Sequence, residues 1–99
     1  MSTNTSIKEK SKVKIKEPKK YRVVMYNDDF TSMDFVVYVL VCVFNKSNTD
    51  AYNIMMEVHK GGKSVVGIYS YDIARSKVER ATSLARGEGY PFRMKVEEN

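Results

Sequence analysis

The chain has 99 residues, of which 42% are apolar and 29% are charged. This length allows one domain with one modest core, and the composition excludes a fibrous or wholly disordered chain. The longest apolar run, from Phe35 to Phe44, is about half as long as a membrane-spanning helix requires. The first 20 residues lack the continuous apolar region of a secretion signal, so we expect a cytoplasmic protein.

The formal net charge of +5 is concentrated in the first 20 residues, which contain seven Lys and two Glu. Residues 21–99 contain ten basic and ten acidic residues and are therefore neutral. Because the segment 1–20 has no aromatic residue and few apolar ones, it cannot bury enough surface to offset the entropy cost of ordering. We expect a flexible basic extension over 1–20, followed by one folded domain over 21–99.

The folded part begins with YRVVMY at 21–26, where β-branched and aromatic residues predict a strand. The Asn-Asp-Asp sequence at 27–29 ends it, because these side chains bond nearby backbone groups and favour turns. The residues from Thr31 to Asp34 have the spacing of a capping box, which predicts a helix to about Asn45. The valines in this span favour a strand, but the apolar positions recur at helical spacing, at Val36, Val39, Leu40 and Val43.

A second helix is predicted from a cap at Asn48 or Thr49 to the glycine pair at 61–62, which would form a left-handed C-terminal cap. KSVVGIY at 63–69 predicts a second strand, in which Gly67 marks a close approach to the backbone. The expected core face of the second helix consists of Ala51, Ile54, Met55 and Val58.

Ser70 is expected to cap a third helix that ends near Gly87, and FRMKV at 92–96 alternates apolar and polar residues like a strand with one wet face. The order of elements predicts an α+β fold, a small βααβαβ sandwich whose three-stranded antiparallel sheet is covered on one face by three helices. Cys42, the only cysteine, lies in the apolar run, so we expect it to be buried and inert. The expected core face of the third helix consists of Ile73, Ala74, Val78, Ala81 and Ala85.

Three groups of residues could carry chemistry, and each also has an ordinary structural interpretation. The acceptors at 27–29 could hold a ligand or simply satisfy the backbone of a turn. His59, the only histidine, could belong to a site or act as a favourable partner of a helix C-terminus. Met33, Met55 and Met56 could line an adaptable pocket or fill the core. No zinc site is expected, because no second histidine or usable cysteine completes a ligand set.

Four stretches of the chain resemble the ClpS family of adaptor proteins: NDDFTSMDFV at 27–36, VHKGGKSVVG at 58–67, DIARSK at 72–77 and YPF at 90–92. The resemblance implies a non-catalytic adaptor without a cofactor. Such an adaptor binds proteins whose free N-terminal residue is Leu, Phe, Tyr or Trp (the N-end rule). It delivers these N-degron proteins to a Clp AAA+ unfoldase and protease. The resemblance further implies a monomer with no nucleic-acid or membrane partner.

The resemblance also assigns roles to individual residues. Asn27, Asp28 and His59 match the family's binders of the substrate amino group. Asp72 and Lys77 match the surface that contacts the N-domain of a ClpA- or ClpC-type unfoldase. The matches to the hydrophobic pocket are Thr31, Met33, Val36, Met55, Val58 and Phe92.

The chain departs from the family pattern at several of these places. Ser32 stands where the family usually has Pro, and Phe92 stands where Leu is common. Arg75 replaces a common acidic residue and Asp72 replaces a common Glu. These two changes leave the predicted unfoldase contact less well supported than the predicted pocket.

Two other classes of function stay open from the sequence. The first is an RNA- or ribosome-associated binding module, which the basic extension supports and the neutral folded domain opposes. The second is a small hydrolase that would use Asp28 and His59, for which the sequence offers no neighbouring nucleophile.

Overall fold

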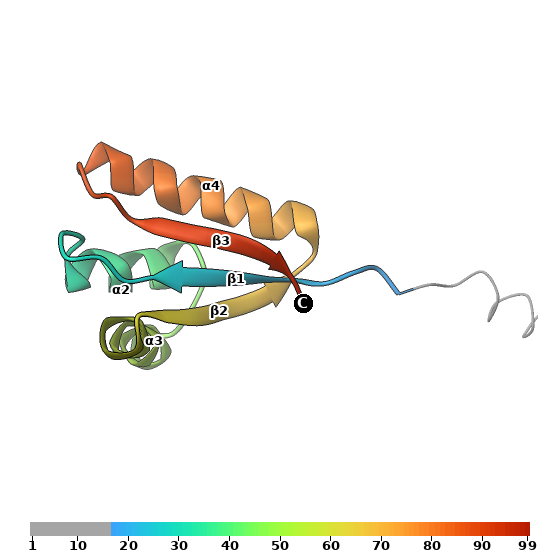
Figure 1. Cartoon of the computed structure of the whole chain (residues 1–99), viewed down its shortest axis with the longest axis horizontal. Helices are drawn as coiled ribbons and strands as arrows, with labels where there is room; N and C mark the ends of the chain where they lie inside the picture. The colour runs from blue at the N-terminus through green and yellow to red at the C-terminus, as the bar shows by residue number, and fades with distance from the viewer. Residues whose placement is uncertain (1–16) are drawn as a thin grey trace, which may run out of the picture.

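The structure is a computed structural model that describes residues 17–99. The flexible extension expected over 1–20 falls mostly outside this range, so the division at residue 20 stays a prediction. The described elements follow the predicted α+β order (Figure 1). They are β1 (Tyr21–Tyr26), α2 (Met33–Cys42), α3 (Asn48–Gly61), β2 (Lys63–Tyr69), α4 (Tyr71–Gly87) and β3 (Arg93–Glu98).

The three strands form an antiparallel sheet in the order β2-β1-β3, so the first strand of the chain lies at its centre. Val23 lies opposite Gly67 and Val24 opposite Val65, which leaves Val66 as an extra residue in β2. A side chain at Gly67 would collide with the ring of Tyr69. The predicted close approach at this glycine is therefore confirmed.

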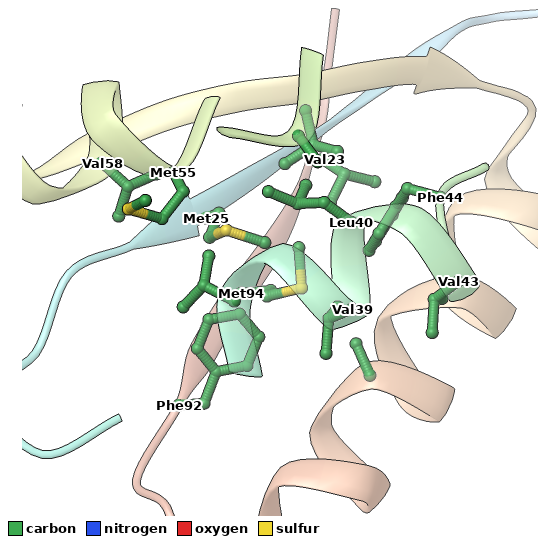
Figure 2. Close-up of a cluster of buried hydrophobic side chains, with 14 of the residues drawn as sticks. Val23, Met25, Val39, Leu40, Val43, Phe44, Met55, Val58, Phe92 and Met94 are labelled. Atoms are coloured by element: carbon green, nitrogen blue, oxygen red, sulfur yellow. The ribbon is translucent and has the colours of Figure 1, made fainter. Parts of the chain in front are cut away.

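The three helices cover one face of the sheet and enclose the core. Val23 and Met25 of β1 and Met94 of β3 are buried against α2 and α3, and Figure 2 shows this cluster. Each such side chain stabilises the fold by roughly 1.5–3 kcal/mol through burial. The fully buried side chains of α4 are all small, which lets its backbone lie close to its neighbours: Ala74, Ala81 and Ala85.

The helix ends differ in detail from their predicted positions. Ser32, and not Thr31, is the N-cap of α2, because its Oγ accepts the Phe35 N–H at 3.1 Å. This hydroxyl replaces the pre-organisation that the family's usual proline would provide. The N-cap of α3 is Ser47, one residue before the predicted Asn48.

The C-terminal ends of α2 and α3 also test the predictions. Helix α2 ends at Cys42, three residues before Asn45, which adopts a left-handed φ of 58° in the following turn. The predicted glycine cap of α3 is confirmed, since Gly62 has a φ of 90° and its N–H donates to the Val58 carbonyl.

Two residues expected in the core are exposed. Cys42 is exposed because it lies roughly 110° around α2 from the centre of the buried stripe. Ile73 is exposed for the same reason, since it lies roughly 100° around α4 from the line of buried alanines. Ile54 and Val78 flank their stripes and are half-buried.

Candidate binding pocket

A cavity of about 220 Å³ opens where β1 ends, bounded by the following turn and by α2 and α3. It brings together eight of the nine residues that the sequence assigns to amine binding and to the hydrophobic pocket, and adds Asp29. The lining residues are Asn27, Asp28, Asp29, Thr31, Met33, Val36, Met55, Val58 and His59.

The carboxylate of Asp28 organises the turn that forms the rim of this cavity. One oxygen, Oδ1, accepts the backbone N–H groups of Phe30 at 2.8 Å and Thr31 at 2.7 Å. The other oxygen, Oδ2, accepts the Thr31 hydroxyl at 2.8 Å. A carboxylate offers roughly four acceptor positions, so about one position remains for a ligand, on Oδ2. Asp28, rather than a cap at Thr31, holds the rim in place.

The same hydrogen bonds control the ionisation of Asp28. Burial favours the neutral acid and acts to raise the pKa of this carboxyl group. The hydrogen bonds from the Thr31 and Phe30 amides and from the Thr31 hydroxyl act in the opposite direction and prevail, so the pKa lies below its ordinary value of 3.8. Asp28 is therefore an anion at neutral pH.

Asn27 and His59 come from different elements but meet at the mouth of the cavity. The Asn27 N–H donates to the Gly62 carbonyl at 2.9 Å, which ties the end of β1 to the C-terminal cap of α3. His59 lies in the last turn of α3, three residues before that cap. Within residues 17–99, neither the Asn27 amide group nor the His59 imidazole makes a hydrogen bond, so both can receive a ligand.

The floor of the cavity is apolar and continuous with the core. Val36 of α2 and Met55 and Val58 of α3 are buried members of the main hydrophobic cluster. Figure 2 shows Met55 and Val58 side by side near Met25. Met33, the first residue of α2, is 43% exposed, so a flexible thioether stands at the mouth of an otherwise fixed hole.

Phe92 is the one predicted pocket residue that does not line the cavity. It is buried in the core near Met94 (Figure 2). Its ring packs edge-on against Phe35, with centroids 6.0 Å apart. It therefore packs against α2 through Phe35. Asp29, absent from the predicted set, could have been found from its place in the same acidic turn.

The two residues assigned to an unfoldase contact have different surroundings. Asp72 is exposed in the first turn of α4. Lys77 is half-buried, and its ammonium group donates to the Val43 carbonyl at 2.8 Å. The same Nζ lies 5.9 Å from the ring centre of Phe44 and 5.7 Å from that of Tyr69. Lys77 therefore joins α4 to the end of α2, and only Asp72 offers its charge freely to a partner.

Residues 17–99 contain neither a candidate metal site nor a candidate membrane span. No group of three His, Cys, Asp or Glu side chains in this range could hold a metal ion. No helix in the same range is long and apolar enough to cross a membrane.

Within residues 17–99, this cavity combines hydrogen-bond acceptors at its rim with an apolar floor, which defines the class of a ligand-binding domain. Comparison with known proteins gives the family. The model of the ATP-dependent Clp protease adaptor protein ClpS matches residues 16–95. The chain belongs to the ClpS family, whose members are adaptors of the Clp protease and not enzymes. This assignment confirms the resemblance and does not favour an RNA-binding module.

Individual relatives are similar in sequence to this protein over most of its length. The ATP-dependent Clp protease adapter protein ClpS of Acetivibrio thermocellus is 48% identical over 93% of each chain. The corresponding protein of Treponema denticola is 51% identical over 82% of this chain and 80% of its own. The solved structure of Agrobacterium tumefaciens ClpS2, bound to L-phenylalaninamide, matches with a TM-score of 0.81 at 37% identity. That match covers 84% of this chain and 100% of the other.

Proposed function

We propose that this adaptor binds proteins whose free N-terminal residue is Leu, Phe, Tyr or Trp and delivers them to a Clp AAA+ unfoldase. One observation carries the proposal: a single cavity combines a rim of unsatisfied acceptors with an apolar floor. A free N-terminus with a large hydrophobic side chain has the complementary combination of charge and bulk.

The rim has the chemistry that an ammonium group requires. The α-amino group of a protein has a pKa of about 7.7–8.0, so near neutral pH it is mostly an ammonium ion with three donors. Asn27 offers an amide oxygen, Asp28 the open position on Oδ2, and the His59 imidazole a ring nitrogen. The contact between the two charged groups is the strongest of these, on the order of 1.5–3 kcal/mol.

The floor selects the side chain of the first residue. Burying a Leu or Phe side chain against Val36, Met55 and Val58 contributes roughly 1.5–3 kcal/mol. Neither this contribution nor the ammonium contact alone outweighs the entropy lost on association. Both together therefore select for a large hydrophobic residue at a free N-terminus.

The relative from Agrobacterium tumefaciens supports this assignment. Its ligand, L-phenylalaninamide, has a free α-amino group, a benzyl side chain and a neutral amide in place of a carboxylate. These are the features of an N-terminal phenylalanine followed by a peptide bond. Transfer of that ligand class to this chain rests on the shared family and on the cavity described above.

A titration series tests the proposal. Peptides that differ only at residue one (Leu, Phe, Tyr, Trp, Ala or Asp), each with a free or an acetylated amine, are titrated against the protein by fluorescence anisotropy. We expect measurable binding for the four large hydrophobic residues with a free amine and a loss of at least tenfold on acetylation. Equal affinity for free and acetylated peptides would contradict the proposal.

Delivery is tested with a Clp unfoldase and protease and a Phe-initiated substrate. We expect the adaptor to accelerate degradation of this substrate and not of its Ala-initiated counterpart. Of the two assigned contact residues, the exposed Asp72 is the better candidate for a direct contact with the unfoldase N-domain, since Lys77 already binds the Val43 carbonyl. Degradation at the same rate with and without the adaptor would contradict a delivery role.

A further inference from the structure

The sheet has a second face, which the helices do not cover. Because Val23 and Met25 point into the core, strand alternation directs the other β1 side chains to the opposite side. The strand register places three residues of each neighbouring strand beside them. We call this surface the open face, and its residues are Arg22, Val24, Tyr26, Lys63, Val65, Ile68, Arg93, Lys95 and Glu97.

The open face carries a row of apolar side chains at positions where a solvent-facing sheet normally has polar ones. Val24 and Val65 are cross-strand neighbours, and Ile68 lies further along β2. Val65 is 48% exposed and Ile68 52% exposed, although the solvent side of an antiparallel sheet normally carries polar residues. Val24 is covered by its neighbours and lies outside the main core cluster. A shallow depression of about 330 Å³ lies over this strip, lined partly by Val24 and Val65.

The charge of the open face is unbalanced. It carries four cations and one anion, whereas residues 21–99 as a whole are neutral. The anion, Glu97, already pairs with Arg22 at 3.1 Å, and the Arg93 guanidinium lies 4.3 Å from the ring centre of Tyr26. Within the described range, Lys63 and Lys95 have no carboxylate partner. Two free ammonium groups therefore flank an exposed aliphatic strip.

We propose that the open face is a docking surface for an acidic, extended segment of a partner protein. The aliphatic side chains of the partner segment lie on Val24 and Val65, and its carboxylates face Lys63 and Lys95. The charge of the surface selects this occupant, because opposite charges attract and also speed association. This surface is separate from the pocket and from Asp72, which lies on α4.

The same observations disfavour three other occupants. The segment 1–20 of this chain is itself strongly basic and would be repelled. A second copy would bring a face of the same charge against this one. Single-stranded nucleic acid is typically bound by aromatic rings on which its bases stack, but the strip is aliphatic and the one ring of the open face, Tyr26, lies against Arg93.

The test uses the full chain and a defined peptide, acetyl-Glu-Val-Glu-Val-Glu-Val-Glu-amide. Acetylation removes the amine that the pocket is proposed to require. The variant Lys63→Glu/Lys95→Glu reverses the two free cations of the open face. The matched control is Arg80→Glu/Arg86→Glu on the exposed side of α4, which changes the net charge equally. We expect at least a tenfold loss of affinity for the first variant and less than a threefold loss for the control, with unchanged circular dichroism.

Amide chemical shifts of the labelled protein locate the bound peptide. Shifts centred on Val65 and Lys95 are expected, with none at Asn27 or His59. Equal losses of affinity in the two variants, or shifts centred on the pocket, would overturn the docking surface. Tighter binding of a uridine oligonucleotide that is lost in Lys63→Glu/Lys95→Glu would overturn it in favour of nucleic acid. Since the peptide lacks a free amine, none of these outcomes depends on the proposed N-terminal recognition.

Discussion

The rim and the floor of the pocket are built in opposite ways. The rim is local, because Asp28 closes a turn through hydrogen bonds to residues two and three positions away. The floor is not local, because Val36 and Met55 reach it from separate helices and belong to the core. Under the proposed function, recognition of the amine should therefore be removable without damage to the fold, whereas the selected side-chain size should depend on how the whole domain packs.

The largest effect is expected from Asp28→Asn. The amide oxygen can still accept the Phe30 and Thr31 N–H groups, and its NH₂ group can donate to the Thr31 hydroxyl, so the turn is retained. The position facing the ligand changes from an anionic acceptor to a donor. We expect a loss of about 1.5–3 kcal/mol in binding a Phe-initiated peptide, roughly 10–150-fold, measured by fluorescence anisotropy. Thermal unfolding at neutral pH serves as the control, and unchanged affinity would remove Asp28 from the amine site.

A smaller effect is expected from pH. His59 is expected to accept from the ammonium group through a ring nitrogen, which a protonated imidazole no longer offers, so affinity should fall between pH 7 and pH 5. Asp28 does not contribute to this fall, because its lowered pKa keeps it ionised throughout that range. Its effect on stability is present above its unfolded pKa of about 3.9 and is lost only as the pH falls through the lower folded value.

The variant His59→Ala tests whether the expected fall in affinity comes from the imidazole. Its affinity should be lower than wild type at pH 7 and flat from pH 7 to pH 5. A wild-type profile that is already flat over this range would remove His59 from the set of acceptors.

A substitution at the mouth of the cavity should alter which N-terminal residue is preferred more than it alters the affinity for the preferred one. Met33 is partly exposed and narrows the entrance, so Met33→Ala should admit β-branched residues without weakening the floor. We expect the ratio of affinities for Leu- and Val-initiated peptides to fall by about three- to tenfold, since one or two methylene groups are worth about 0.8 kcal/mol each. Tyr52→Ala, at an exposed site of α3 outside the pocket lining, is the control. The same change of ratio in both variants would argue against a role for Met33.

The smallest effect on binding is expected at the start of α2. Ser32 caps this helix and also accepts the Tyr90 hydroxyl at 3.3 Å, but it does not line the pocket. Ser32→Ala should lower the free energy of unfolding by about 1 kcal/mol, measured by urea denaturation. Peptide affinity should stay within about twofold of wild type. A large loss of affinity would mean that the rim depends on the helix cap as well as on Asp28.

The sequence predicted the features that depend on neighbouring residues. The strand at 21–26, the acidic turn after it and the Gly62 cap each follow from local backbone chemistry, and all are found in the structure. The candidate pocket residues were predicted from stretches of the sequence that resemble the ClpS family. Their assembly in one cavity follows from the antiparallel order of the elements.

The errors concern positions decided by packing. Cys42 and Ile73 are exposed because each lies about 100° off a buried stripe, and the apolar character of a residue does not reveal which side of a helix is covered. The assignment of Phe92 to the pocket is not among these errors and stays a prediction: its ring contacts Phe35 across the fold and lies outside the cavity lining. The capping residues Ser32 and Ser47 each have a sequence neighbour, Thr31 and Asn48, that is an equally acceptable cap. The sequence does not show which of the two side chains faces the helix end.

The central claim is that the rim binds the ammonium group and the floor selects the side chain of the first residue. A double-mutant cycle tests it directly, with wild type and Asp28→Asn each titrated with a Phe-initiated peptide and with its 3-phenylpropanoyl analogue, which lacks only the amine. We predict a coupling energy of at least about 1.5 kcal/mol, since the substitution should weaken binding of the first peptide strongly and of the second hardly at all. Equal losses for both peptides, giving a coupling energy near zero, would contradict the account.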